Sequence, residues 1–372
     1  MSKINRHIDP TVPHRVLVAP LDWGLGHATR MIPVVRALEQ AGSEVFLAGE
    51  GRIRTLLHLE FPHLPMLSLE GYNVSYSKHP FFLPIHLLKQ MPSLVKKIKQ
   101  ENEWLKKMQD QHGFSAVISD NRYGLYHPQL KSIFITHQLR IKAPALIEDI
   151  LQNMHYRFIK KFDECWIPDA AGDDNLSGRL AHPKKLPPMP VKYLGPLSRF
   201  KRSGEQKADH LLILLSGPEP QRSLLEEQLL DELEHYTQPV VLVRGMPGHA
   251  DKLTINDNIK VYDHLPAQEL ESLMERASII ISRSGYSTVM DLAQLRKKSI
   301  LIPTPGQTEQ GYLGKHLVEK RFALCLPQKK FRLRPALDLA AHFPYSFPAF
   351  NTEQLMPTVE EFLRTLPPPP GR

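Results

Sequence analysis

The sequence predicts an α/β protein made of two Rossmann-like, doubly wound domains that face a central cleft. Two observations support this fold class. Strand-like apolar runs alternate with helical patterns along most of the chain, and the alternation stops at a polar segment and then starts again. The chain has 372 residues, of which 42% are apolar and 23% charged, so each of two domains can bury a core.

The first half opens with a strand, a turn, a helix and a second strand. The valine-rich run His14–Pro20 precedes a glycine-rich turn and a helical pattern. The next strand-like run is Glu44–Gly49, and this order of elements implies a parallel sheet. One face of the helix is expected to carry Met31, Val34, Val35 and Leu38. Further strands are expected at 115–120, 131–137 and 163–168, with a helix at 143–162.

The polar stretch Gly195–Asp209 is the best candidate for a linker, and the alternation restarts after it. We expect a first domain over 1–200, a second over 201–346, and a final segment over 347–372. In that segment the helix at 352–366 is a candidate to return to the first domain, before a proline-rich tail. In the second half, strands are expected at 210–217, 239–245, 258–265, 278–283 and 299–305, and helices at 221–236, 267–277, 287–297 and 309–321.

Composition excludes several classes of protein. The net charge of +8 suits an anionic ligand or a membrane surface, but no basic stripe with interleaved aromatic residues supports nucleic-acid binding. Two distant cysteines, Cys165 and Cys325, rule out a disulfide scaffold and fit a reducing compartment. No run is long and apolar enough to span a membrane, and the first residues do not form a signal peptide. We therefore expect a cytoplasmic protein that holds no metal ion.

Residues 79–108 leave two interpretations open. Apolar residues that include Phe81 and Phe82 precede a series of lysines. Such a segment can lie on an anionic membrane as a peripheral contact. It can equally be an amphipathic helix that packs on the first domain and keeps its lysines in solvent.

The loop after the first strand is the first candidate site. Gly24 and Gly26 allow a sharp turn, and the following helix points free N–H groups and a positive dipole toward the cleft. His27 lies at this helix start, where the dipole would lower the pKa of its imidazole and favour a neutral base. Residue 29 is a threonine, so the dinucleotide fingerprint is incomplete. A tight turn with no ligand is the alternative.

A second candidate site follows two strands of the second half. Ser284 and Gly285 precede a helix that contains Thr288, and free backbone donors there suit a phosphate. Asp291 lies one turn into this helix, where a carboxylate can accept hydrogen bonds from a ribose diol. The next helix opens with Glu309 and Gln310 at the same sheet edge. Together these residues suit a sugar nucleotide.

This second pattern, with Arg283 before it and Pro303 after it, resembles the donor-binding half of GT-B glycosyltransferases of the family 28 type. The similarity is to the peptidoglycan N-acetylglucosaminyltransferase family that makes lipid II, and it extends over about residues 14–320. The resemblance implies that Asp291 holds the ribose, that the helix start holds the diphosphate, and that Glu309 and Gln310 bind sugar hydroxyls.

The resemblance also assigns residues elsewhere in the chain. It makes His27 the proposed base and places Gly24, Gly26, His137 and Gln138 on the acceptor side. Ser216, Gly217 and Arg244 are the remaining donor-side candidates. The sequence departs from the family pattern where prolines follow Gly217, where Asp291 replaces a glutamate, and where Gly311 replaces a second glutamine. Preference for a particular donor sugar therefore does not carry over.

We expect an enzyme that moves a sugar from a nucleotide sugar, most simply a UDP-sugar, to an acceptor hydroxyl with inversion and without a metal ion. The acceptor is expected to be lipid-linked or a small molecule, and the resemblance implies a role in the cell envelope. Asp120, at a strand end, is the alternative base or orients His27, and His137 is a further candidate. Two other functions stay open, a nucleotide-sugar 2-epimerase and a non-catalytic nucleotide-sugar-binding protein.

Overall fold

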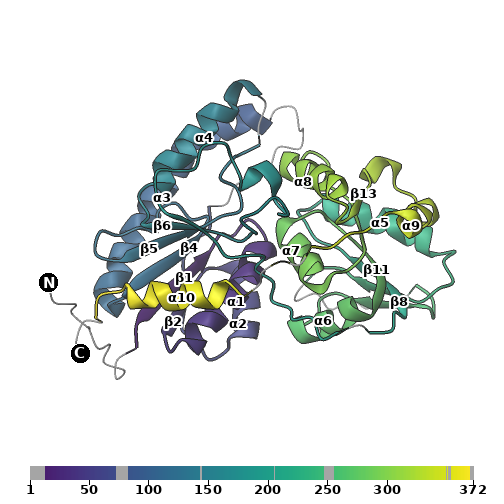
Figure 1. The fold of residues 1–372 in the computed structure, drawn as a ribbon, viewed down its shortest axis with the longest axis horizontal. Helices are drawn as coiled ribbons and strands as arrows, with labels where there is room; N and C mark the ends of the chain where they lie inside the picture. The colour runs from purple at the N-terminus through teal and green to yellow at the C-terminus, as the bar shows by residue number, and fades with distance from the viewer. Residues whose placement is uncertain are drawn as a thin grey trace.

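The computed structural model describes residues 13–72, 83–142, 145–204, 206–246, 255–348, 350 and 353–368; within it, residues 83–91 and 145–147 are described by their backbone alone. Two parallel sheets lie beside each other, each flanked by helices (Figure 1). Each sheet has the strand order of a doubly wound fold, so the predicted fold class is confirmed.

The first sheet contains, over the described residues, seven parallel strands in the order β3-β2-β1-β4-β5-β6-β7. The strands are β1 (Arg15–Pro20), β2 (Glu44–Ala48), β3 (Met66–Leu67), β4 (Ala116–Asp120), β5 (Lys131–Ile135), β6 (Glu164–Ile167) and β7 (Val191–Tyr193). Because β1 and β4 are neighbours in the middle of this sheet, the loops at their carboxyl ends meet.

The second sheet contains, over the same described ranges, six parallel strands in the order β10-β9-β8-β11-β12-β13. The strands are β8 (His210–Leu214), β9 (Val240–Val243), β10 (Ile259–Tyr262), β11 (Ala277–Ser282), β12 (Ser299–Leu301) and β13 (Leu324–Cys325). Strand β11 lies between β8 and β12, so the loops that follow these three strands are adjacent.

The helices of the first half are α1 (Leu25–Gln40), α2 (Gly51–Glu60), α3 (Leu83–His112) and α4 (Ala145–Ile159). In α1 the four residues predicted to share one face, Met31, Val34, Val35 and Leu38, are all completely buried. Burial of aliphatic side chains of this size stabilises a fold by about 1.5–3 kcal/mol each. The 3.6-residue period of the sequence therefore gave the correct face of this helix.

Only part of the segment 79–108 can be followed. Residues 79–82 lie outside the described residues, and so do the side chains of 83–91. Beyond them, α3 buries Ile98 and Leu105 on the first domain and exposes Lys96, Lys99 and Lys106 to solvent. That arrangement matches the packed amphipathic helix for the described part of the segment.

The second half adds α5 (Gln221–Leu233), α6 (Ala267–Arg276), α7 (Tyr286–Leu295), α8 (Thr308–Glu319) and α9 (Leu333–His342), with a short 3₁₀ turn at Gln328–Lys330; a similar turn at Gly178–Leu180 lies in the first half. Of these helices, α7 and α8 lie on the side that faces the first half (Figure 1). Between Tyr193 and His210 the described chain forms neither helix nor strand, but Leu197 and Phe200 in this connection are buried. The connection is therefore packed against the two halves.

The last helix, α10 (Leu355–Arg364), lies on the first half, where it contacts α1 (Figure 1). Phe362 is completely buried and meets the ring of Trp166 in β6 edge-on, with ring centroids 5.4 Å apart. Val359 is also fully buried in the same core. The chain thus crosses from the second half back to the first before it ends.

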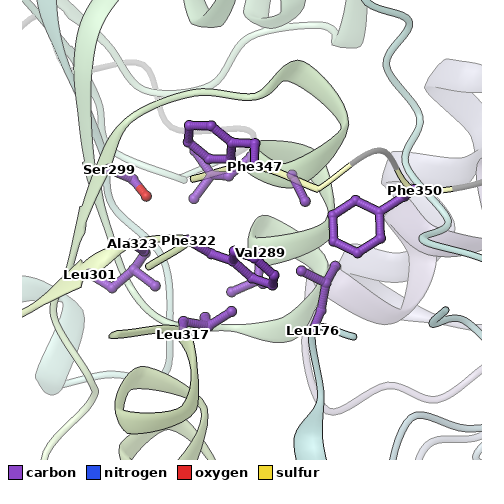
Figure 2. Close-up of a pocket in the computed structure, with 11 residues that line it drawn as sticks. Leu176, Val289, Ser299, Leu301, Leu317, Phe322, Ala323, Phe347 and Phe350 are labelled. Carbon is purple, nitrogen blue, oxygen red and sulfur yellow. The ribbon is translucent and has the colours of Figure 1, made fainter. Parts of the chain in front are cut away.

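One apolar core continues from the first half into the second. The segment that leads toward α10 covers part of it, and a cavity of about 10 Å³ remains beneath Phe347 and Phe350 (Figure 2). This space holds about one water molecule. Its lining is almost wholly apolar and includes Leu176, Val289 and Phe322 but none of the predicted site residues. The cavity is a packing gap between the halves and has no room for a substrate.

Candidate functional site

The predicted base stands at the carboxyl edge of the first sheet. His27 lies in the first turn of α1, and Asp120 is the last residue of β4. Because β1 and β4 are paired, the two side chains meet, and His27 Nδ1 lies 2.9 Å from Asp120 Oδ2. The side chain of His27 is 17% exposed, whereas that of Asp120 is completely buried.

The two glycines of the loop act differently from the sequence expectation of a sharp turn. Gly24 has φ 165° and ψ 158°, an extended backbone that any residue can adopt. At Gly26 the requirement is close approach, since an added Cβ would lie 2.9 Å from Ser287 Oγ in α7. Ser287 Oγ donates a hydrogen bond of 2.7 Å to the Gly26 carbonyl. The glycine loop therefore touches the start of α7 across the interface of the two halves.

Sequence reasoning missed Arg30, which organises this edge of the sheet. Its side chain is 2% exposed. Its guanidinium donates two hydrogen bonds to the Asp120 carboxylate, from Nε to Oδ2 at 2.9 Å and from Nη2 to Oδ1. Nη2 also lies 2.6 Å from His27 Nδ1, and Nη1 lies 3.1 Å from His137 Nδ1. Its spacing of three residues from His27, on the helix face that carries Met31 and Val34, could have identified it.

His137 links the first half to the second. It follows β5, and its Nε2 lies 2.7 Å from Oε1 of Glu309 in the first turn of α8. Its ring is stacked on the ring of Tyr286, the first residue of α7. Gln138 is the neighbour of His137 in the chain, and its Nε2 lies 3.4 Å from the same ring nitrogen. The structure thus brings the predicted acceptor-side residues against two donor-side helices.

Burial and charge set the protonation of these groups. Burial lowers the pKa of His27, and the Arg30 guanidinium lowers it further, against the opposing influence of Asp120. The direction matches the expectation for a neutral base, but the causes are burial and Arg30. Burial would raise the pKa of Asp120, yet the charges of Arg30 and His27 and their hydrogen bonds bring it below its ordinary value. Burial likewise opposes the lowering of the Glu309 pKa, which His137 causes.

The loop before α7 contains a buried cation without a carboxylate partner among the described contacts. Arg283 is 1% exposed, and burial lowers the pKa of its guanidinium to about 10. Its donors meet neutral oxygens that belong to three neighbouring loops. The acceptors are the carbonyl of Gln221 at 2.6 Å, Gln328 Oε1 at 2.8 Å, and the carbonyls of Ile302 at 3.3 Å and Pro303 at 3.4 Å. Arg283 therefore fixes these loops together and keeps a positive charge behind them.

Ser284 and Gln310 are engaged with each other. Ser284 Oγ donates to the Gln310 carbonyl at 3.0 Å, and Gln310 Oε1 accepts from the Thr304 backbone at 2.8 Å. Both residues are buried. Gly285 caps α7, and no side chain caps the helix there, so first-turn N–H groups remain available as donors. Thr288 in this turn is half-buried.

Asp291 meets the connection between the halves. Its Oδ1 accepts a hydrogen bond of 2.6 Å from Ser198 Oγ, and its Oδ2 lies 3.9 Å from Arg199 Nε. Burial raises the pKa of Asp291 to about 6 despite these partners. This pairing could not be predicted, because Ser198 and Arg199 belong to a stretch whose course depends on how the two halves pack.

The remaining donor-side candidates lie at the ends of β8 and β9. Ser216 and Gly217 are exposed after β8, and Gly217 has φ 108°, a conformation that favours glycine. Arg244 is paired with two carboxylates, Glu226 at 2.5 Å and Asp263 at 2.7 Å. Its charge is thus already neutralised within the second half.

Among the described residues, no group of three or more His, Cys, Asp or Glu side chains could hold a metal ion. In the same part of the chain, no helix is long and apolar enough to cross a membrane.

Comparisons with known proteins agree with this architecture. Residues 221–346 match the model of the glycosyltransferase family 28 C-terminal domain. An uncharacterized glycosyltransferase of Methanopyrus kandleri is 22% identical over 82% of this chain and 91% of its own length. A UDP-N-acetylglucosamine--N-acetylmuramyl-(pentapeptide) pyrophosphoryl-undecaprenol N-acetylglucosamine transferase of Lachnospira eligens is 26% identical over 77% of this chain and 78% of its own.

Solved structures are similar over nearly the whole chain. The glycotransferase of kitacinnamycin aligns with a TM-score of 0.63 at 14% identity, covering 95% of both chains. MurG of Acinetobacter baumannii aligns with a TM-score of 0.54 at 15% identity, again covering 95% of both chains. The resemblance inferred from the sequence is thereby confirmed. The chain is a glycosyltransferase with the GT-B fold, and its residues 221–346 are similar to the glycosyltransferase family 28 C-terminal domain.

Proposed function

We propose that the protein transfers a sugar from a UDP-sugar to an acceptor hydroxyl, with inversion at the anomeric carbon and without a metal ion. The observation that carries this proposal is the contact of the His27 loop with the start of α7, where Ser287 Oγ meets the Gly26 carbonyl at 2.7 Å. This contact supports the proposal, because it brings the loop of the proposed base next to the helix start that is proposed to bind the diphosphate.

On the acceptor side, His27 is the general base. It takes the proton of the acceptor hydroxyl while the acceptor oxygen forms a bond to the anomeric carbon. Asp120 Oδ2 lies 2.9 Å from Nδ1 and orients the ring when Nδ1–H donates to it in the reacting state. A single displacement of this kind inverts the configuration of the anomeric carbon.

On the donor side, the bond from the anomeric carbon to the diphosphate breaks, and negative charge develops on the leaving group. The uncapped N-terminus of α7 supplies backbone donors for that charge. The buried Arg283 cation stands behind the same loop and is balanced by no carboxylate among the described contacts. Preformed donors of this kind make a metal ion unnecessary in the proposed mechanism.

Recognition of the nucleotide involves Asp291 as a ligand of the ribose. In the structure, Asp291 accepts from Ser198 Oγ, so a ribose hydroxyl has to replace that bond. Uracil is the proposed nucleobase of the donor, because the relative from Lachnospira eligens is named for a UDP-sugar. Glu309 and Gln310 are proposed to meet the donor sugar.

The acceptor is proposed to be a lipid-linked or small-molecule hydroxyl of the cell envelope. The similarity to a transferase named for a pyrophosphoryl-undecaprenol acceptor supports this assignment. Although α3 packs on the first half through Ile98 and Leu105, its lysines at 96, 99 and 106 are exposed, and such a basic face is compatible with a peripheral contact with an anionic membrane. Free cysteines at 165 and 325 fit a reducing compartment, so the cytoplasmic side of that membrane is the proposed location.

A panel of nucleotide sugars tests the proposal. Thermal-shift measurements should show that a UDP-sugar stabilises the protein more than the matching ADP-, GDP- and TDP-sugars do. The stabilising donor is then incubated with membrane lipid extract or candidate small acceptors, and release of UDP and the anomeric configuration of the product are measured.

Two outcomes would contradict the proposal. Conversion of the UDP-sugar to an isomer without any acceptor would indicate an epimerase. Binding of the UDP-sugar without turnover over the whole acceptor panel would indicate a non-catalytic nucleotide-sugar-binding protein.

A further inference from the structure

The ring nitrogen Nδ1 of His27 lies between a hydrogen-bond acceptor and a hydrogen-bond donor. Asp120 Oδ2, at 2.9 Å, can only accept a hydrogen bond as a carboxylate. Arg30 Nη2, at 2.6 Å, can only donate one. A neutral imidazole nitrogen either carries a hydrogen or accepts one, so Nδ1 can satisfy only one of these partners at a time.

The partner to which Nδ1 is hydrogen-bonded decides whether His27 can act as a base. When Nδ1 accepts from Arg30, the ring hydrogen is on Nε2, and Nε2 cannot take a proton from the acceptor. When Nδ1–H donates to Asp120, Nε2 has a free lone pair and can take that proton. The shorter contact in the structure is the one with Arg30.

The contact between Arg30 and His137 shows which ring nitrogen of His137 carries the hydrogen. Arg30 Nη1 lies 3.1 Å from His137 Nδ1, and a guanidinium has no acceptor. His137 Nδ1 therefore accepts, its hydrogen is on Nε2, and Nε2–H donates to Glu309 Oε1 at 2.7 Å. Glu309 belongs to α8 of the second half, so it fixes one of the acceptors that hold the Arg30 guanidinium in place.

We propose that Arg30 is a positioning residue that holds His27 in the tautomer with hydrogen on Nε2, and that Glu309, through His137, keeps Arg30 in this arrangement. When the hydroxyls of a donor sugar hydrogen-bond to the Glu309 carboxylate, His137 loses its acceptor. Arg30 then loses a partner that is held in a fixed position. Nδ1 of His27 then donates to Asp120, and Nε2 becomes the base. The base would thus be switched on by the donor. This inference rests on the proposed role of His27.

The charged and titratable groups that face His27 are few in the described structure. Arg30 comes from its own helix, Asp120 from the end of β4, and His137 from the end of β5. Glu309 acts on the cluster from α8. The burial of Arg30 and Asp120 excludes water from their contact, so the competition at Nδ1 is decided by these side chains.

Long-range ¹H–¹⁵N correlation spectra of protein labelled in histidine measure the tautomer directly, and His27→Gln assigns the signal. At a pH where His27 is neutral, the wild type should show hydrogen on Nε2. Arg30→Met should move it to Nδ1. Glu309→Ala should raise the fraction with hydrogen on Nδ1, because His137 then lacks its acceptor. The matched controls Arg36→Met in α1 and Glu319→Ala in α8 should leave the wild-type tautomer.

Arg30→Met leaves the buried Asp120 without its cation and can fail to fold, so Glu309→Ala serves as the second variant, since a third of the Glu309 side chain is exposed. Hydrogen on Nδ1 in the unliganded wild type, or an unchanged tautomer in folded Glu309→Ala, would overturn the inference. The spectra need no substrate. A protein that shows the expected tautomers but transfers no sugar would overturn the proposed function and leave the Arg30 assignment intact.

Discussion

The ring of His137 lies parallel to the ring of Tyr286, with centroids 4.3 Å apart and 3° between the planes. The Tyr286 hydroxyl donates to the carbonyl of Pro168, at 2.9 Å, on the first half. The first residue of α7 is thus held against the first half both by its ring face and by its hydroxyl. This contact fixes the start of the proposed diphosphate-binding helix next to the histidine cluster.

His27→Ala should lower kcat by about 10²–10⁴-fold, the usual contribution of a general base. The donor KM should change little, because the proposed donor contacts lie in the other half. Steady-state kinetics and a thermal melt on the same preparation measure both effects. The exposed His58 in α2 provides the control His58→Ala. A near-normal kcat together with a lowered Tm would mean that His27 only packs the loop.

Asp291→Ala should weaken binding of UDP by about 1–3 kcal/mol, because the ribose loses a charged acceptor. Ser198→Ala should have the opposite effect, since it removes the hydroxyl that occupies the carboxylate in the structure. Isothermal titration with UDP measures both variants, and Asp338→Ala on the exposed face of α9 is the control. Equal affinities for all of them would exclude the ribose assignment.

Asp291→Asn should change how stability depends on pH. Burial raises the pKa of Asp291 to about 6 in the folded protein, compared with about 3.9 in an unfolded chain. The stability that the neutral carboxyl contributes is complete below the unfolded pKa and is lost as the pH rises through 6. The loss amounts to at most roughly 3 kcal/mol.

The amide of the Asn variant does not ionise. Its free energy of unfolding should therefore match the wild type near pH 4 and exceed it above pH 7. Urea unfolding at a series of pH values measures the difference. A difference between the two proteins that does not vary with pH would contradict the assigned pKa.

Chelation of divalent ions by EDTA should leave turnover nearly unchanged, because backbone donors of α7 and the Arg283 cation stabilise the leaving diphosphate in the proposed mechanism. Initial rates before and after EDTA treatment, and after addition of Mg²⁺ or Mn²⁺, are the measurement. Loss of activity with EDTA and its return with either ion would show that a metal ion does this work.

Phe362→Ala should lower the free energy of unfolding by about 3–5 kcal/mol, since it leaves a cavity where a buried ring meets Trp166. Chemical denaturation measures this loss. Turnover per folded molecule should be retained, because α10 lies outside the proposed site. Leu339→Ala, which changes an exposed apolar side chain, is the control.

Much of the architecture could be predicted because it follows from local patterns. The spacing of Met31, Val34, Val35 and Leu38 identified the buried face of α1. Strand and helix alternation identified both sheets, since each element carries its own periodicity. The bounds differed at the ends: the helix expected to end at 162 ends at Ile159, and the one expected at 352–366 is Leu355–Arg364.

Contacts between distant side chains could not be predicted in this way. The sequence placed Glu309 and His137 at sheet edges, but their 2.7 Å contact depends on how two halves dock. The same holds for Asp291 and Ser198, which come from a helix and a connection. Arg30 is different, because its helical spacing from His27 was visible. A search for the spacing of apolar residues alone does not detect a charged residue, such as Arg30, that is buried on the apolar face of a helix.

The return of α10 to the first half gives the molecule two chain connections across its interface, the buried segment around Leu197 and the segment that follows α9. Two bodies joined by one tether can swivel in any direction. With two chain connections, rotation of one half relative to the other is confined mainly to the axis that passes through both connections. Opening of the interface to admit a donor would then follow a single arc, and each closure would return His137 to the same place above Tyr286.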